Sequence, residues 1–488
     1  MSAEQAASLF KHKMVVGTSG FTKSGDSKVV MSAFAERAKH EEVAITLITG
    51  ASLGYNTDAD LAEHQALIKR MPFQADATLR KKINSGEVLY IDQHLSETAE
   101  LLSNKHIPKV TIAVIEAAFI DENGNIIPTT SVGNSATFAQ LADQIIIEVN
   151  TTIPLEIEGI HDVVTIDNYP HRKPIQILNV ADRIGKTFIE IDPNKVVAIV
   201  FTEIKDSPAQ FSEPDSKTEA ISKHLVGFFE NEIKEGRLTP TLLPLQVGIG
   251  KVANAVMSGL GKGNFKDLVM FSEVLQDSTF HLMDAGKMTF ASASSITVSD
   301  ECYQHIFKNF SFYKDKIALR PQTISNSAEL IRRLGIIAIN TAIEFDIYGN
   351  VNSTHISGTN MMNGIGGSGD FARNAYLSIF VSQSTSKENN AISHVLPMVS
   401  HVDHTEHDVD ILVTEQGLAD LRGLAPRERA RVIIQNCVHP DYKEVLIDYL
   451  ERAELKGGQT PHILEEAFDF HIRLKETGTM KQKYLVEK

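Results

Sequence analysis

Short runs of β-branched and other apolar residues recur along this chain, and their spacing constrains its fold more than any other feature. In the first half, the runs cover residues 14–17, 43–49, 110–115, 145–149 and 196–201. Each run is almost continuously apolar, which is typical of strands that a parallel sheet buries on both faces. Between the runs, stretches with amphipathic helical spacing, such as 32–40 and 60–69, predict connecting helices. The alternation predicts an α/β fold built from βαβ units, with parallel-rich sheets flanked by helices.

The alternating pattern breaks near residue 206. Residues 206–215 are polar and contain Pro208 and Pro214, and a charged helix is predicted over 216–236. Strand-like runs then resume at 268–271, 336–340 and 411–413, and a helical region is predicted beyond Pro426. We therefore predict two lobes, residues 1–215 and 216–488, with the functional site between them.

The charge balance excludes several classes of partner. Lys and Arg total 47 against 62 Asp and Glu, so the net charge is −15, and the sequence has no basic cluster that would neutralise phosphates. No run approaches the ~18 consecutive apolar residues of a membrane span. We predict a protein that binds neither nucleic acid nor membrane.

Two further features predict a cytoplasmic location. The N-terminal residues carry Glu4 and no apolar core, which is unlike a signal peptide or a transit peptide. Cys302 and Cys437 are the only cysteines, so no disulfide framework is expected. Both are expected to be buried structural residues.

Two glycine-rich loops match dinucleotide-binding patterns by letter. Residues 248–253 read G-x-G-x-x-A and residues 364–369 read G-x-G-x-x-G, and helices are predicted after them over 253–260 and 371–380. Glycines let a backbone approach a ligand, and a helix N-terminus offers N–H groups to negative oxygen. An NAD-binding fold also has an acidic residue about 20 residues after its glycine loop, and Glu273 lies near that distance from the first loop. The loops leave open an NAD-dependent oxidoreductase, another anion site, or glycines that serve tight turns alone.

Glu273 is the candidate nucleophile. It follows the strand-like run 267–272 and lies one loop away from a glycine-rich turn, where open α/β sheets bind their ligands. A carboxylate can attack an activated acyl group and form an anhydride, which a thiolate then opens. From position alone, a surface or ion-paired glutamate is the alternative interpretation.

A histidine-rich run at 401–407 is the candidate metal site. It contains three His and two acids, but in an extended segment His401 and Asp403 face away from His404 and Glu406. We therefore expect a polar, hydrogen-bonded loop beside the functional site and no metal.

Several long stretches resemble the acetyl-CoA hydrolase/transferase family, which includes class I CoA-transferases that act on acetate and succinyl-CoA. The matching stretches occur in order over nearly the whole chain and are GTSGFTKSGDSKVV (from Gly17), PFQADATLRKKINSGE (from Pro72), SVGNSATF (from Ser131), LPLQVGIGKVANAV (from Leu243), SEVLQDSTFHLMDAGK (from Ser272), STHISGTNMMNGIGGSGDFARNAYLSIF (from Ser353) and HVDHTEHDVDILVTEQGLADLRGL (from His401).

This resemblance implies roles for particular residues. By match to the motif S/T-E-V-x-Q-D, Glu273 would be the covalent residue, and Gly367 in the GGSGDF run would supply a backbone N–H to an oxyanion hole. The residues that it assigns to binding of CoA and the substrate are Ile249 and Gly250 at the thioester pocket, Gly366, the polar pocket residues Thr78, Asn326 and Glu415, and Lys387 for CoA.

The resemblance also implies a function and an assembly. It implies two related lobes, usually as a homodimer, that move CoA between an acyl-CoA and a small carboxylate such as acetate. CoA is then a substrate, and no metal or redox cofactor is needed. Where the family pattern implies Asp-Arg, this chain has Asp206 and Ser207, so succinate is not assumed as the acceptor. An acetyl-CoA hydrolase that uses water as the acceptor is the main alternative, and a catalytically silent CoA-binding module is a minor one.

Overall fold

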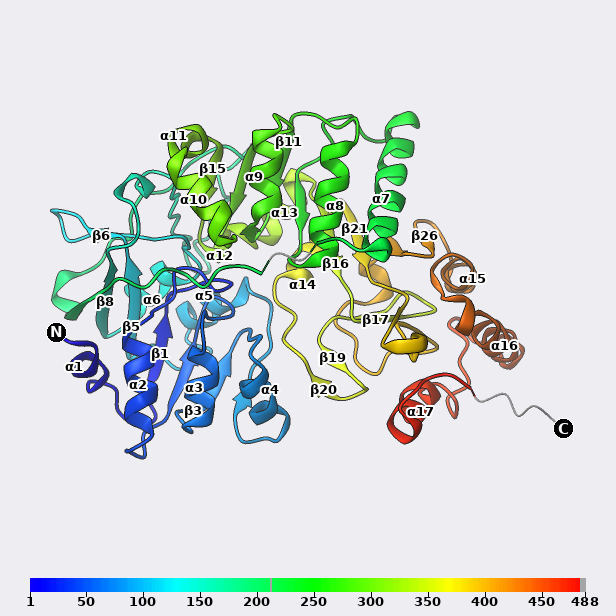
Figure 1. Ribbon diagram of the computed structural model, residues 1–488, viewed down its shortest axis with the longest axis horizontal. Coiled ribbons are helices and arrows are strands. Elements are labelled where there is room, and N and C mark those ends of the chain that lie inside the picture. Colours follow the sequence, from blue (N-terminus) through cyan, green and yellow to red (C-terminus); the bar gives the residue numbers. More distant parts are fainter. Residues whose placement is uncertain (211–212, 483–488) are drawn as a thin grey trace.

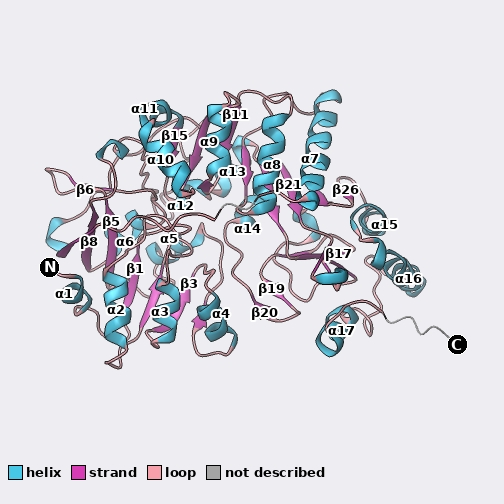
Figure 2. Cartoon of the chain, in the orientation of Figure 1, coloured by secondary structure: helices cyan, strands magenta, loops and turns pink. Residues whose placement is uncertain are grey.

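Two separate, mainly parallel β-sheets form the centre of the protein, one from each half of the chain (Figure 2). The computed structural model describes residues 1–210 and 213–482. The first sheet is parallel throughout, and its seven strands in spatial order are β4 (Leu89–Tyr90), β3 (Leu67–Met71), β2 (Ile45–Ile48), β1 (Val15–Thr18), β5 (Ile112–Ala117), β8 (Gln144–Asn150) and β9 (Val196–Thr202).

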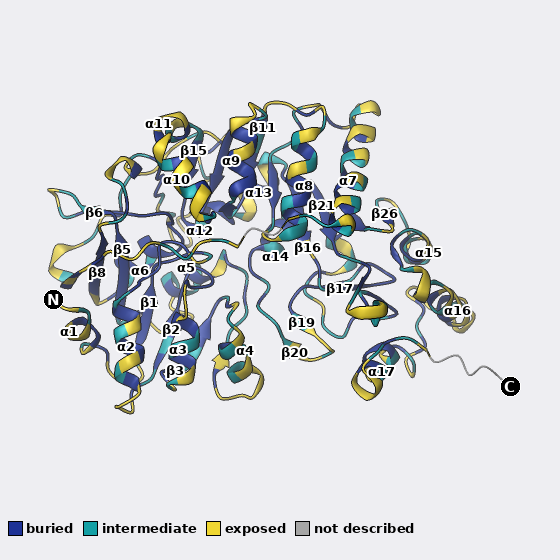
Figure 3. Ribbon diagram, viewed as in Figure 1, coloured by how far each residue is buried: buried dark blue, intermediate teal, exposed yellow. Residues whose placement is uncertain are grey.

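Helices cover both faces of the first sheet, as parallel strands require. Along β5, Val114 points into one apolar cluster while Ala113 and Ile115 point into another, so both faces of the strand are buried. The helices of this lobe are α1 (Ala3–Ala7), α2 (Val30–Ala38), α3 (Thr57–Glu63), α4 (Ala77–Asn84), α5 (Glu97–Ser103) and α6 (Ser135–Leu141). Figure 3 shows the strands buried and the outer sides of the helices exposed.

The second sheet has eight strands and one antiparallel edge pair. In spatial order they are β15 (Ile317–Leu319), β13 (Met288–Ala293), β11 (Leu268–Phe271), β10 (Leu245–Val247), β16 (Ile337–Thr341), β21 (Leu377–Val381), β25 (Ile411–Thr414) and β26 (Gly417–Asp420). The helices of this half up to residue 374 are α7 (Ser216–Lys234), α8 (Lys251–Lys262), α9 (Asp277–Asp284), α10 (Asp300–Lys308), α11 (Phe310–Tyr313), α12 (Gln322–Ser325), α13 (Ala328–Leu334) and α14 (Ser368–Asn374).

Loops between strands of the second sheet carry short strand pairs, and helices close the C-terminal end (Figure 1). The short strands include β12 (Val274–Leu275) with β14 (Ser295–Ile296), β17 (Glu344–Asp346) with β18 (Val351–Asn352) and β24 (Val395–Leu396), β19 (His355–Ile356) with β20 (Asn360–Met361), and β22 (Thr385–Ser386) with β23 (Ile392–Ser393). The final helices are α15 (Pro426–Cys437), α16 (Pro440–Lys456) and α17 (Asp469–Thr477), which confirms the helical region predicted beyond Pro426.

A buried joint ties the two halves together. Arg320, directly after β15, donates from Nε to Asp162 of the first half at 2.9 Å, and both side chains are fully buried. The Arg320 guanidinium also donates to the Val180 carbonyl and to Ser292 Oγ, each at 3.0 Å. Breaking a buried pair leaves an uncompensated charge in a poorly solvated place. The joint therefore fixes how the lobes face each other.

The predicted strand runs are confirmed, and two of the predicted helices are wrong. The helix predicted over 60–69 ends at Glu63, and strand β3 begins at Leu67. The helix predicted over 371–380 ends at Asn374, and strand β21 begins at Leu377. In both places a very short connection joins a helix to a strand, so there was no turn signal to separate them. The lobe boundary at residue 215 stays a prediction; β9 ends at Thr202 and α7 begins at Ser216.

Among the described residues, no helix combines the length and the apolar character that crossing a membrane would require.

Candidate active site

Glu273 lies at the carboxyl end of the second sheet, between β11 and β12. It faces a cavity of about 320 Å³ that both lobes line. The first lobe contributes Phe21 and Leu95, and the second contributes Val247 and Gly367. Ligands of open parallel sheets bind at this edge, so the strand position places the carboxylate where the sequence predicted.

Two residues lie against one oxygen of the Glu273 carboxylate, and one of them donates a hydrogen bond to it. Asn326, which directly follows α12 and is fully buried, donates from Nδ2 to Glu273 Oε1 at 2.8 Å. Gly367, the N-cap of α14, approaches the same oxygen so closely that a Cβ there would lie 1.8 Å from Oε1 and 2.4 Å from Asn326 Nδ2. A side chain at position 367 would therefore displace the carboxylate from its present position.

The surroundings shift the proton affinity of Glu273. Burial raises its pKa from 4.5 to about 7, the negative charge of Asp370 adds to the increase, and the Asn326 hydrogen bond opposes it. Burial likewise raises the pKa of Asp370 to about 7, against the hydrogen bonds from Ser96 and Asn326. A carboxylate with a raised pKa is more basic, and it is still ionised just above neutral pH.

An apolar wall borders the carboxylate. Phe21, Ala51, Leu95 and Val274 form a small buried cluster, with Phe73 packed against it, apart from the main cores. All five residues line the cavity that contains Glu273. The wall offers apolar surface of the size of a short acyl group, and it gives water few hydrogen-bonding partners.

The first glycine loop joins this cavity to a second one of about 350 Å³. Ile249 and Val274 line both cavities, and Gly250, with φ +106°, lines the second. The loop lies between β10 and the N-terminus of α8. The two cavities together form an elongated space that runs from the Glu273 carboxylate past Gly250.

The structure brings most of the predicted site residues together. Ile249, Gly366 and Gly367 line the cavity with Glu273, Asn326 touches the carboxylate, and Gly250 lines the adjoining cavity.

Three predicted binding residues lie outside these cavities in the described structure. Thr78 is in the first turn of α4, where its N–H donates to Oδ1 of the N-cap residue Asp76. Glu415 accepts hydrogen bonds from the N–H and Oγ of Ser384, and Lys387 lies on a neighbouring loop with φ +61°. Their assignment to CoA or substrate stays a prediction.

The sequence analysis missed two residues near Glu273, namely Asp370 and its hydrogen-bonding partner Ser96. Asp370 accepts from Asn326 Nδ2 at 3.2 Å, and it also accepts from Ser96 Oγ at 2.6 Å. Asp370 lies within the GGSGDF run, so the motif carried a signal for it. Ser96 carried none, because its position depends on how the lobes pack.

The histidine-rich run forms the polar loop that was expected. Asp403 accepts from the Ser353 N–H at 2.7 Å, and His404 Nε2 lies 3.1 Å from Ser368 Oγ. Ser353 and Ser368 line the Glu273 cavity, so the run lies beside the site. Over residues 1–210 and 213–482, no group of three or more His, Cys, Asp and Glu side chains is arranged to hold a metal ion. Cys302 and Cys437 are buried free thiols, which confirms their predicted burial.

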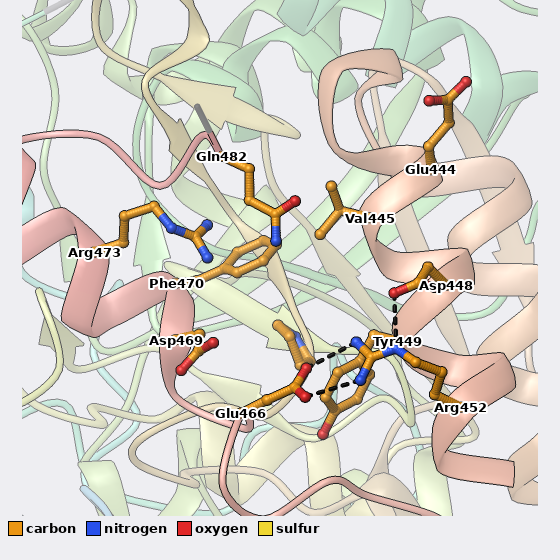
Figure 4. A pocket seen from close by; sticks show the side chains of 11 residues that line it. Glu444, Val445, Asp448, Tyr449, Arg452, Glu466, Asp469, Phe470, Arg473 and Gln482 are labelled. Atoms are coloured by element: carbon orange, nitrogen blue, oxygen red, sulfur yellow. Dashed lines mark hydrogen bonds and ion pairs between the residues drawn. The ribbon is translucent and has the colours of Figure 1, made fainter. Parts of the chain in front are cut away.

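A further cavity lies among the C-terminal helices (Figure 4). Arg452 crosses it and pairs with Asp448 and with both carboxylate oxygens of Glu466. None of its lining residues is a predicted site residue. The ion pairs of Arg452 with Asp448 and Glu466 link helix α16 to the segment before α17, which indicates a structural role for these three residues.

Two family matches cover most of the chain. The N-terminal domain of the acetyl-CoA hydrolase/transferase family matches residues 1–201, and its C-terminal domain matches residues 303–450. The chain belongs to the acetyl-CoA hydrolase/transferase family. It is 50% identical to the succinyl-CoA:acetate CoA-transferase of Clostridium kluyveri over 99% of this chain and 90% of that protein. It is 46% identical to the acetyl-CoA hydrolase of Schizosaccharomyces pombe over 97% of this chain and 94% of that protein.

Solved structures confirm the fold class of this family member. RipA from Yersinia pestis superimposes with a TM-score of 0.73 over 93% of this chain and 97% of that one, at 21% identity. An α/β architecture with parallel-rich sheets flanked by helices is therefore confirmed. These comparisons give no support to the oxidoreductase interpretation of the glycine loops, and the structure uses both loops to surround Glu273.

Proposed function

We propose that this chain is a CoA-transferase that moves CoA between an acyl-CoA, such as acetyl-CoA or succinyl-CoA, and a small carboxylate such as acetate. One observation carries the proposal. A glutamate with a raised pKa follows strand β11 of the second sheet, faces a partly apolar cavity, accepts a hydrogen bond from Asn326, and lies so close to Gly367 that a Cβ there would displace it.

The hydrogen bond to Oε1 assigns different tasks to the two oxygens of Glu273. Oε2 attacks the acyl-CoA carbonyl and displaces the CoA thiolate, which leaves an acyl-glutamyl anhydride. The thiolate then attacks Cδ of Glu273, so that the acyl group leaves as a free carboxylate and a glutamyl-CoA thioester remains. An acceptor carboxylate reverses both steps and leaves as the new acyl-CoA. In this cycle CoA is a substrate, and neither a metal nor a redox cofactor takes part.

The shape of the site supports the transfer of a thioester. The acyl group fits against the wall of Phe21, Ala51, Leu95 and Val274, and the arm of CoA that carries the thiol fits the elongated space past Ile249. The anhydride and the thioester are both sensitive to water, and the apolar wall limits the places where a water molecule could be held.

Mass spectrometry tests the covalent step directly. After incubation with acetyl-CoA, the peptide that contains Glu273 should carry the mass of CoA through a thioester, and borohydride should reduce that thioester and inactivate the protein. A protein that turns over without this adduct, or with the adduct on another peptide, contradicts the proposal.

An acetyl-CoA hydrolase is the second candidate, favoured by the 46% identity to a relative of that name. The two activities differ in their dependence on the acceptor. A transferase conserves the thioester bond, so the thioester absorbance stays constant until a second reaction traps one of the exchange products. The rate of transfer also depends on the acetate concentration. A hydrolase consumes acetyl-CoA at the same rate with or without acetate.

The proposal extends to assembly and location. The family resemblance supports a homodimer, which light scattering on the purified protein tests directly. The two unpaired buried cysteines fit a reducing compartment, and a cytoplasmic location follows from that fit. Fractionation of the source cells tests the location.

A further inference from the structure

Asn326 stands between two carboxylates. Its Nδ2 donates to Glu273 Oε1 at 2.8 Å and to Asp370 Oδ2 at 3.2 Å, so each of its two N–H bonds has an acceptor. Its Oδ1 accepts from Ser325 Oγ at 2.9 Å. Asn326 is fully buried and Asp370 nearly so, so a polar atom that loses its partner here would lie away from bulk solvent.

Asp370 is itself held in place from the other lobe. Ser96, the N-cap of α5, donates to it twice, from Oγ to Oδ1 at 2.6 Å and from the backbone N–H to Oδ2 at 3.1 Å. Together with Asn326, Asp370 accepts three hydrogen bonds. This set of donors suits a carboxylate, and it fixes the side chain at the boundary between the lobes.

The amide of Asn326 has two orientations of nearly equal shape. In the observed one, the NH₂ group faces both carboxylates; in the flipped one, Oδ1 would face two negative groups and Ser325 Oγ would lose its acceptor. Glu273 alone enforces the observed orientation only while it is ionised. Once Glu273 is an anhydride or a thioester, its negative charge is gone and its carbonyl is a weaker acceptor.

We infer that Asp370 is a positioning residue that keeps the Asn326 N–H aimed at Oε1 while Glu273 is covalently modified. This inference rests on the proposed function. When a thiolate or a carboxylate attacks Cδ of modified Glu273, the carbonyl π pair moves onto Oε1, and the negative charge develops on the atom that Asn326 already contacts. The tetrahedral state then collapses and expels the carboxylate or the thiolate. A donor fixed before the attack stabilises this charge without reorganisation.

Two substitutions separate orientation from charge. Asp370→Ala removes the acceptor, whereas Asp370→Asn keeps an amide oxygen that accepts from Asn326 but carries no charge. Loss of one oxyanion donor costs ~10²–10³-fold, and a donor that is only loosened should cost less. We expect discharge of the isolated glutamyl-CoA enzyme by acetate to slow by about 10–100-fold in Asp370→Ala, and Asp370→Asn to restore most of that rate.

The pH profile provides a readout that a purely structural role would not move. The charged and titratable groups around this pair are Glu273 after β11, Asp370 on α14, Glu97 on α5 and His94, whose ring lies against Gly369. Removing the negative charge of Asp370 relieves its repulsion of ionised Glu273. The acidic limb of kcat/KM should therefore move to lower pH in both variants.

Asp410→Asn is the matched control. Asp410 is a partly buried carboxylate that accepts a backbone N–H, from Ser378 at 2.9 Å, but it does not line the cavity. It should leave the discharge rate and the pH profile unchanged. If Asp370→Ala discharges at the wild-type rate, or if Asp370→Asn is as slow as Asp370→Ala with an unmoved acidic limb, the inference is wrong. Absence of any CoA adduct on wild-type Glu273 would instead overturn the proposed function, so the two failures are distinguishable.

Discussion

Replacing Gly367 with alanine tests the geometry around Glu273 without adding backbone strain. Gly367 has φ −91° and ψ −2°, values that alanine adopts without difficulty. Its Cβ, however, would lie 1.8 Å from Glu273 Oε1, and real Cβ atoms do not approach heavy atoms closer than 3.0 Å. Oε1 must therefore move by at least 3.0 − 1.8 = 1.2 Å, and Asn326 Nδ2, at 2.4 Å from the same Cβ, must move as well.

The expected loss follows from these displacements. A misplacement of about 1 Å at a reacting centre costs ~10²-fold, and weakening the Asn326 donor adds to that loss. We expect kcat to fall at least ~100-fold, which corresponds to about 2.7 kcal/mol of transition-state stabilisation. The melting temperature should change little, because the affected atoms border a cavity and are not part of the main cores.

Steady-state transferase assays, mass spectrometry of the Glu273 peptide and thermal unfolding measure these quantities. Gly227→Ala, in the middle of α7 with no heavy atom within 4 Å of the new Cβ, is the control. It should raise stability by about 0.5–1 kcal/mol and leave kcat unchanged. Gly367→Ala with a kcat within threefold of wild type would refute the reasoning, because Glu273 would then have to react well from a displaced position.

Three further perturbations test other parts of the argument. Glu273→Gln should abolish transfer and the CoA adduct. Folding raises the pKa of the Glu273 carboxyl from 4.5 to about 7, so protonated Glu273 stabilises the folded protein fully below pH 4.5, and this stability is lost as the pH rises through 7. The variant should therefore resist urea better than wild type at pH 8 and equally at pH 4.5, and wild-type kcat/KM should rise with pH through about 7. Arg320→Ala should cost ~3–5 kcal/mol in urea unfolding because it strands buried Asp162, whereas Lys109→Ala, from an exposed pair, should cost under about 1 kcal/mol. Val274→Thr keeps the shape of the apolar wall but offers water a partner, so the ratio of acetyl-CoA hydrolysis to transfer should increase; an unchanged ratio would mean that the wall does not limit water.

The strands were predictable because their signal is local. A parallel strand buried on both faces must be apolar at nearly every position, whatever its neighbours are. Strand β3 escaped this rule because it contains Lys69 and Arg70. Arg70 is fully buried and pairs with Asp58 of α3 at 2.9 Å. Because this ion pair lets a charged residue lie inside the sheet, the sequence pattern of β3 resembles that of an amphipathic helix.

The candidate site also has a part that local sequence predicts and a part that it does not. The position of Glu273 at the edge of the second sheet was predictable from its place after a strand, whereas its catalytic role stays a prediction. The contacts that tune it were not, since Ser96 and Asp370 are far apart in sequence and meet only because the lobes pack at a fixed angle. The apolar wall likewise combines Phe21 and Leu95 with Val274, and no window of sequence contains all of them.

The cavity at Glu273 is compatible with both a transferase and a hydrolase, and the size of the cavity does not distinguish the two activities. Any space that admits acetate also admits water, so discrimination has to come from where each molecule finds partners. Water needs two to four polar contacts to be held in a cavity, and the wall of Phe21, Ala51, Leu95 and Val274 supplies no polar side chain. In the proposed cycle, a carboxylate acceptor such as acetate packs its methyl group against that wall and directs its oxygens toward Cδ of Glu273, beside the N–H that Asn326 donates to Oε1. On this proposal, the balance between transfer and hydrolysis in this chain depends on a few apolar contacts beside Glu273, and Glu273 plays the same part in both reactions.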